Sequence, residues 1–174
     1  MPTAEQLCDE VVRQCRHELG QSLGKIERAV ERLPAEQLWN RAHENENAIG
    51  NLLLHLAGNL RQWIICGVGG KDDTRDRTAE FAQREALPLD GLLEKLRATV
   101  EEADATLATV TPDLLLEKRR IQVYEVTGTQ ALLHVITHFS EHTGQILWAV
   151  KRMTGEDLGF YKHLSPKSES AENS

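Results

Sequence analysis

The sequence has few aromatic residues and no long apolar run. Phe, Trp and Tyr together make up 5% of its 174 residues. No stretch approaches the roughly 20 consecutive apolar residues of a membrane-spanning helix. The first residues, Met1 to Glu5, lack the apolar region of a signal peptide. We therefore expect a cytoplasmic protein that has no membrane partner.

Positive charge is also scarce. The chain contains 20 Lys and Arg against 27 Asp and Glu, which gives a formal net charge of −7. Proteins that bind the phosphates of nucleic acids or anionic membranes usually carry an excess of Lys and Arg. The charge therefore argues against a nucleic-acid partner, although it does not identify another partner.

Cysteine is rare as well, since only Cys8, Cys15 and Cys66 occur and none forms a Cys-x-x-Cys pair. Cys8 and Cys15 lie seven residues apart in a predicted helix, or about 10 Å along its axis. That separation is too large for a disulfide. We expect buried, unreactive thiols rather than catalytic or metal-binding ones.

What the sequence does contain is apolar residues spaced by three and four, the period of one helix face. Four such stretches with little strand signal predict an all-α four-helix bundle. The length suits one domain, which we expect over residues 1–164, followed by a disordered Ser- and Glu-rich tail over 165–174. The predicted helices cover residues 3–33, 47–66, 88–110 and 129–153.

Capping residues indicate where two of these helices begin and end. Asn45 or Asn47 suits the start of the second helix, and Thr127 or Thr129 suits the start of the fourth. Gly155 is expected to end the fourth helix.

Two connecting segments are unusual. Residues 71–87 are polar and too long for a tight turn, so we expect a functional loop or a crossover there. Residues 114–129 contain residues of strand propensity but have no obvious partner strand, and we expect an extended excursion along the bundle.

The fourth predicted helix carries His134, His138 and His142 at intervals of four residues. Such residues share one helix face, and two imidazoles at i and i+4 can bind the same metal ion. With His138 at zero on a helical wheel, the apolar residues fill roughly +20° to +160°, while His142 falls at about +40° and His134 at about −40°. We therefore favour His138 and His142 as ligands and place His134 in an outer shell or on the surface.

A third ligand is expected from another helix, and His55 is the best candidate. The same wheel places Asn51, His55, Asn59 and Gln62 in one polar stripe beside the apolar face of the second helix. A polar stripe next to the core is where a helix bundle forms a site. Asn51, Asn59 and Gln62 are candidates to orient the imidazole or to contact a substrate.

Three neutral imidazoles would leave an open position on a divalent metal ion. Such a site acidifies a bound water and acts as a Lewis acid. Imidazole ligands suit zinc, nickel, iron or copper, so the histidines do not select one metal.

The segments that carry these histidines resemble the two signature segments of the DinB/YfiT-like superfamily. They are residues 51–59, NLLLHLAGN, and residues 138–146, HFSEHTGQI. The resemblance follows the order of the helices as far as Gly155. It implies a four-helix bundle with up-down-down-up connectivity and a long crossover between the second and third helices. It also implies that His55, His138 and His142 hold one metal ion, with zinc or nickel as the leading candidates, and that the protein is a homodimer.

The resemblance leaves the reaction open. Some members resemble thiol S-transferases or isomerases, others are metal-dependent hydrolases, and many have no known activity. Our leading hypothesis is an S-transferase that acts on a small molecule with a low-molecular-weight thiol, whose pKa the metal would lower. The alternatives are hydrolysis, for which Glu141 is a marginal general base, and a non-enzymatic module that binds a metal or a small molecule.

Residues outside the polar stripe are further substrate candidates. Arg75 and Arg77 in the polar connection could bind a carboxylate at the mouth of the bundle, although such a charge run is usually solvated. Tyr124 could reach the same mouth from the extended excursion. For the homodimer, the first helix offers an apolar stripe that includes Leu7, Val11, Leu19 and Leu23.

Overall fold

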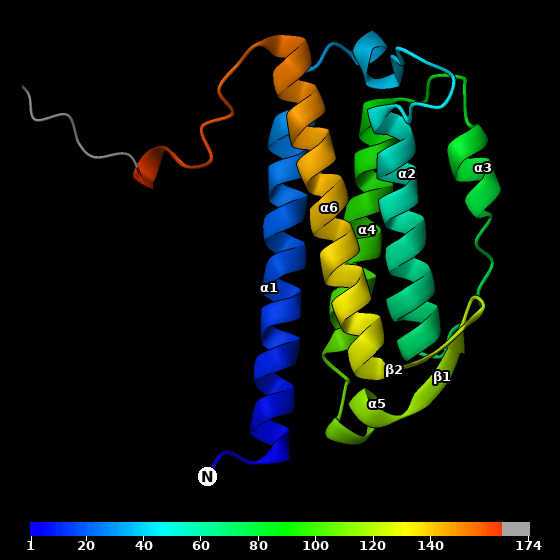
Figure 1. Cartoon of the computed structure of the whole chain (residues 1–174), viewed down its shortest axis with the longest axis vertical. Helices are drawn as coiled ribbons and strands as arrows, with labels where there is room; N and C mark the ends of the chain where they lie inside the picture. The colour runs from blue at the N-terminus through cyan, green and yellow to red at the C-terminus, as the bar shows by residue number, and fades with distance from the viewer. Residues whose placement is uncertain (165–174) are drawn as a thin grey trace, which may run out of the picture.

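The computed structural model describes residues 1–164. The predicted tail, residues 165–174, lies outside the described residues. The chain is mostly helical, as the sequence predicts, and four long helices lie side by side (Figure 1). They are α1 (Ala4–Val30), α2 (Ile49–Leu60), α4 (Leu89–Leu107) and α6 (Gly128–Thr154).

The colours of Figure 1 show the direction of each long helix. α1 and α6 run one way, and α2 and α4 run the other way. α1 packs mainly on α6, and α2 packs mainly on α4. Since α2 and α4 point in the same direction, the chain must return along the bundle between them, and residues 71–87 make that crossover.

α1 begins with a capping box, in which the Thr3 hydroxyl accepts from the Gln6 backbone and the Gln6 side chain accepts from the Thr3 backbone. The helix ends at Val30, three residues before the predicted end. Leu7, from the apolar stripe that was assigned to the homodimer, is 63% exposed. The predicted apolar stripe is therefore divided, because Leu19 is 2% exposed and belongs to the core.

α2 begins after Ala48, so the prediction of Asn45 or Asn47 as its cap was wrong. The cap comes from within the helix, since Asn51 Oδ1 accepts from the Ala48 backbone N–H at 3.2 Å. α2 continues directly into a π-helix, η2 (Arg61–Val68). π-helical turns are rare, and they are frequent at functional sites.

The crossover contains a short helix, α3 (Arg77–Ala82), which the sequence did not predict. Its cap is Asp76, whose carboxylate accepts from the Ala79 backbone at 2.9 Å. α3 packs against α2. Asn51 ties it there, because Asn51 Nδ2 donates to the Glu80 carbonyl at 2.8 Å and to the Gln83 carbonyl at 3.1 Å.

The segment before α6 was expected to be extended without a partner strand, and that part of the prediction was wrong. It forms the short helix α5 (Pro112–Leu116) and then pairs with itself as an antiparallel hairpin, β1 (Lys118–Ile121) and β2 (Tyr124–Thr127). The turn uses a positive φ of 54° at Gln122. The hairpin lies at the end of the bundle where α6 begins (Figure 1).

α6 shows the expected caps. Of the two candidates, Thr127 caps the helix and accepts from the Gln130 backbone at 3.2 Å. Gly155 ends the helix with a left-handed φ of 70°, which glycine adopts at little cost. The remaining short elements are η1 (Ala35–Trp39) and η3 (Lys162–Leu164).

The core fills the space between the long helices. Each fully buried Leu or Ile contributes roughly 1.5–3 kcal/mol of hydrophobic free energy relative to an exposed one. The side chains that are nearly inaccessible to solvent include Ile26, Leu53, Leu56, Leu96, Leu132 and Ile146.

Within residues 1–164, the structure contains no helix with the length and hydrophobicity of a membrane span.

Candidate metal centre

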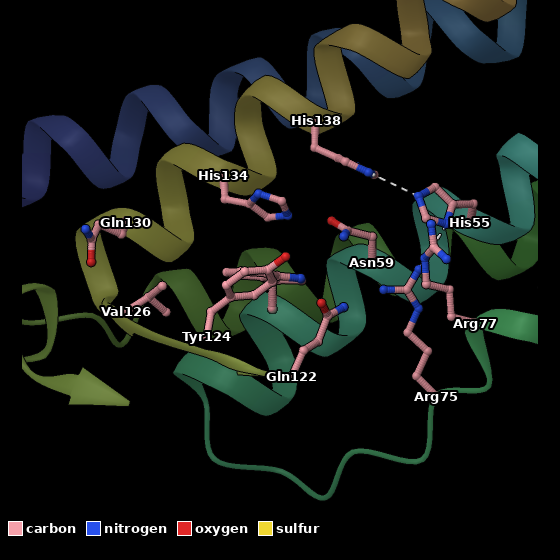
Figure 2. A pocket seen from close by; sticks show the side chains of 11 residues that line it. His55, Asn59, Arg75, Arg77, Gln122, Tyr124, Val126, Gln130, His134 and His138 are labelled. Carbon is pink, nitrogen blue, oxygen red and sulfur yellow. Dashed lines mark hydrogen bonds between the residues drawn. The ribbon is translucent and has the colours of Figure 1, made fainter. Parts of the chain in front are cut away.

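Three histidines from two helices meet on one side of the bundle. His55 comes from the middle of α2, and His138 and His142 lie one turn apart on α6. One ring nitrogen of each lies within 4.8 Å of the other two. Figure 2 shows His138 and His55 pointing toward each other, with their Nε2 atoms 3.1 Å apart.

The second ring nitrogens of His55 and His142 have contacts that fit metal binding, whereas His138 Nδ1 is buried with no hydrogen-bond partner among residues 1–164. His55 Nδ1 lies 3.0 Å from Glu80 Oε2, and His142 Nδ1 lies 2.8 Å from Gln145 Oε1. When each Nδ1–H donates to its oxygen, each Nε2 keeps a free lone pair. Metal-binding histidines usually donate their second N–H to such a carboxylate or carbonyl oxygen.

Burial keeps the imidazole of His138 neutral, and the neutral form is the one that binds a metal. Burial and the neighbouring charges of His142 and His55 lower the pKa of His138 to about 3. Burial also lowers the pKa of His55, although its hydrogen bond to Glu80 acts in the opposite direction.

Glu80 belongs to a buried ion pair that sequence reasoning missed. Its two carboxylate oxygens accept hydrogen bonds from Arg75 Nε at 2.7 Å and from Arg75 Nη2 at 2.8 Å. The side chains of Arg75 and Glu80 are 4% and 11% exposed. Burial alone would raise the pKa of Glu80, but hydrogen bonds from Arg75 and His55 outweigh it and hold that pKa below its ordinary value.

A glycine on α2 makes room for this pair. A Cβ placed on Gly58 would overlap the Glu80 carboxylate and come within 2.9 Å of Arg75 Nε. The absence of a side chain at Gly58 therefore leaves space for the pair in its observed position next to His55. The contact between His55 and Glu80 brings the crossover into the site.

A cavity of about 380 Å³ is lined by His55 and His138 of this group, whereas His142 does not line it. Its walls come from α2, η2, the crossover, the hairpin and α6. Figure 2 shows several of its side chains, including Asn59, Gln122, Tyr124 and His134, around one common space.

The three candidates from the polar stripe, Asn51, Asn59 and Gln62, have different contacts. Asn51 is buried and binds backbone carbonyls of the crossover, so it does not orient an imidazole. Gln62 accepts from Arg75 at 2.8 Å and donates to Asp73 at 2.6 Å. Asn59 lines the cavity and is 5% exposed.

His134 lies neither at the surface nor within the group of three histidines. It is half-buried and stacks on Trp63, with ring centroids 3.9 Å apart. It lines the cavity, as do Arg77 and Tyr124. Arg75 also lines it, but its guanidinium is paired with Glu80 rather than free to bind a ligand.

Sequence reasoning missed Glu80 and the cavity-lining residues Trp63, Gln122, Val126 and Gln130. Glu80 had no periodic signal, because it lies in a segment that was expected to be a polar loop. Gln122 depended on the unpredicted hairpin. Trp63 has no polar pattern of its own, and its stacking on His134 depends on how two helices pack, which no single helix reveals.

The three cysteines agree with the expectation of buried thiols. Cys8, Cys15 and Cys66 are all free and 2–8% exposed. Burial raises the pKa of each thiol, which lowers the thiolate fraction at neutral pH. None of them belongs to the group of three histidines.

Comparison with solved structures supports the fold. The chain is similar to a crystal structure described as the conserved protein of locus from Enterococcus faecalis, with a TM-score of 0.70. The likeness covers 83% of this chain and 97% of that chain at 16% sequence identity, so it concerns the fold alone. No curated protein matches the sequence.

A family comparison covers nearly the whole chain. The match extends over residues 6–167, which include α2, α4, α6, all but the first two residues of α1, and the three candidate ligands His55, His138 and His142. The chain therefore belongs to the family described as Protein of unknown function (DUF1572).

Proposed function

We propose that this protein binds one divalent metal ion, zinc or nickel, through His55, His138 and His142. The observation that carries the proposal is the convergence of three imidazoles from two helices, with ligand atoms within 4.8 Å of one another. The short distance between His55 Nε2 and His138 Nε2 supports the proposal, because two neutral ring nitrogens 3.1 Å apart can coordinate the same cation.

We further propose that the protein is a metal-dependent enzyme of the thiol S-transferase type. A bound ion would supply Lewis acidity that lowers the pKa of a thiol co-substrate and favours its thiolate. The protein would contribute three neutral imidazoles, the Glu80 carboxylate that orients His55, and a cavity of about 380 Å³ for the small-molecule substrate. The chain's own cysteines are buried away from this group, so the thiol would come from a small molecule.

Hydrolysis is the alternative enzymatic function, and the site favours it less. It usually requires a general base close to the attacking water. No Asp or Glu of the described residues lines the cavity. Glu141, the marginal candidate, is exposed, and Glu80 is already paired with Arg75. A non-enzymatic metal or small-molecule binding module is the remaining alternative.

The arrangement of the long helices supports membership of the DinB/YfiT-like superfamily, with up-down-down-up connectivity.

We also propose a homodimer formed by the outer face of α1 and α6, where Leu7 and Leu133 are 63% and 57% exposed. Val11 and Ile136 lie half-buried on the same two helices. Three free cysteines are consistent with the cytoplasm as the proposed compartment, because thiols stay reduced there.

Metal binding is tested by calorimetric titration of chelator-treated protein with zinc and with nickel. We expect about one equivalent to bind, and we expect His55→Ala and His142→Ala to abolish tight binding. His17→Ala is the matched control, because His17 is exposed on α1 and away from the site. Tight binding that survives both site substitutions would refute the proposed ligands.

The enzymatic proposal needs a separate assay. Metal-loaded protein is incubated with a panel of low-molecular-weight thiols and electrophilic acceptors, and with a panel of esters and amides. Thioether formation that is lost in His142→Ala would support the transferase. Turnover of esters alone would favour the hydrolase, and one tightly bound metal with no turnover would favour the binding module.

A further inference from the structure

The cavity beside the histidines has walls without negative charge, although the protein as a whole has a net charge of −7. Among the described residues, its lining includes Arg75 and Arg77 but no Asp or Glu. Because Arg75 is paired with Glu80, the guanidinium that remains for a ligand is that of Arg77.

Arg77 lies at the solvent-exposed edge of the cavity. Its guanidinium is 4.8 Å from the centre of the Phe81 ring. Within residues 1–164 it forms no ion pair with a carboxylate, whereas the neighbouring Arg75 binds both oxygens of one. A guanidinium held by an aromatic ring and free of a carboxylate is well suited to bind an oxyanion.

Trp63 lines the same cavity and carries a buried hydrogen-bond donor. The residue is 4% exposed and lines the cavity, and its Nε1–H has no partner in the described part of the chain. An indole N–H can only donate, and it usually finds an acceptor when it is buried. The nitrogen itself is almost inaccessible to solvent, so its N–H signal reports a ligand that packs on the ring rather than one that accepts from it.

Aromatic rings give the cavity flat walls. Trp63 stacks on His134 with ring centroids 3.9 Å apart and an interplanar angle of 31°. The ring centroid of Tyr124 lies 6.3 Å from that of Trp63, and Tyr124 is 55% exposed. Asn59 adds an amide, and Figure 2 shows it projecting into the same space as Gln122. A planar or apolar body would pack on the rings while its polar end meets the donors.

From these features we propose that the cavity binds a small organic anion with a planar body, whose carboxylate or phosphate oxygens pair with Arg77 and accept from the wall of the cavity. This inference rests on the proposed function in one respect: it makes the anion the substrate class of the metal site. A cationic ligand is disfavoured, since Arg77 would repel it and no cavity-lining carboxylate among residues 1–164 would bind it.

The test uses benzoate, phenyl phosphate and the neutral benzamide as probes, in both zinc-loaded and zinc-free protein. Binding is followed by NMR through the indole N–H signal of Trp63, which is assigned with Trp63→Phe. We expect both anions to shift this signal and to bind at least tenfold more tightly than benzamide. Binding of one anion alone would identify a carboxylate or a phosphate as the recognised group.

Substitutions at Arg77 separate charge from shape. Arg77→Gln should weaken binding of the anions about tenfold, the size of one charge-assisted hydrogen bond, and Arg77→Lys should restore part of that loss. Arg152→Gln is the matched control, because Arg152 is also exposed and its guanidinium lies 5.4 Å from the centre of the Trp148 ring. It should leave the affinity unchanged.

The outcomes distinguish this inference from the proposed function. Equal affinity for benzamide and benzoate, or no effect of Arg77→Gln, would overturn the anion site even if zinc binds. Anion binding in protein that takes up no metal would support the anion site and refute the metal proposal.

Discussion

Replacing Glu80 with Gln removes one negative charge from the centre of the site while keeping the size of the side chain. Arg75, which is 4% exposed, then loses the carboxylate that binds it through two hydrogen bonds. Removing one partner of a buried ion pair typically costs 3–5 kcal/mol, because the other charge stays buried and uncompensated. The amide oxygen of Gln still accepts one hydrogen bond, so we expect a loss of about 3 kcal/mol, at the lower end of that range.

The same substitution should weaken metal binding. His55 Nδ1 would lose its charged acceptor at 3.0 Å, and with it the preference for the tautomer that leaves Nε2 free. Loss of such an outer-shell partner usually lowers metal affinity by about 10–100-fold. Urea unfolding at neutral pH measures the stability of the metal-free protein, and calorimetric titration with zinc measures the affinity.

Glu102→Gln is the control for the Glu80 substitution. Glu102 also binds two basic residues, Arg61 at 2.6 Å and Lys71 at 2.7 Å, but its side chain is 32% exposed and those of its partners are 42% and 59% exposed. Exposed pairs contribute about 1 kcal/mol or less, so this variant should lose little stability and no metal affinity. A Glu80→Gln variant as stable as Glu102→Gln, with unchanged zinc affinity, would refute the reasoning about the buried pair.

Three further predictions concern other parts of the molecule. Gly58→Ala should displace the Glu80 carboxylate and lower zinc affinity in titrations, and unchanged affinity would show that the pair can move aside. Asp104→Asn should cost at most about 1 kcal/mol at neutral pH, since the pair with Arg16 is 42–43% exposed. The hydrogen bond from Arg16 lowers the pKa of Asp104, so this stabilisation is present above the unfolded value of about 4 and should vanish in urea unfolding as the pH falls through the lowered pKa. Leu133→Glu should convert the proposed homodimer to a monomer by light scattering, and a monomeric parent at micromolar concentration would contradict the dimer.

The sequence carried enough information to predict the four long helices and the meeting of the three histidines. Spacing of four residues brings His138 and His142 onto one face of a helix, and the apolar residues of the same wheel turn that face inward. His55 stood out because a polar stripe borders the apolar face of its helix. These are local properties of single helices, which is why the pattern alone revealed them.

The parts that were not predicted depend on contacts between distant segments. Glu80 reaches His55 only because α3 packs on α2 and because Gly58 leaves space for it. The hairpin turns at Gln122 with a positive φ, where sequence patterns favour Gly or Asn. The π-helical turn of η2 also changes the angular positions that a regular wheel assigns to Gln62 and Trp63.

The most direct test of the central claim is zinc K-edge X-ray absorption on protein loaded with one equivalent of zinc. If His55, His138 and His142 bind the ion, the spectrum should show three imidazole nitrogens at about 2.0–2.1 Å, and His142→Ala should lose that three-nitrogen shell together with tight binding. A shell dominated by sulfur at about 2.3 Å, or a spectrum that the substitution does not change, would contradict a three-histidine metal centre.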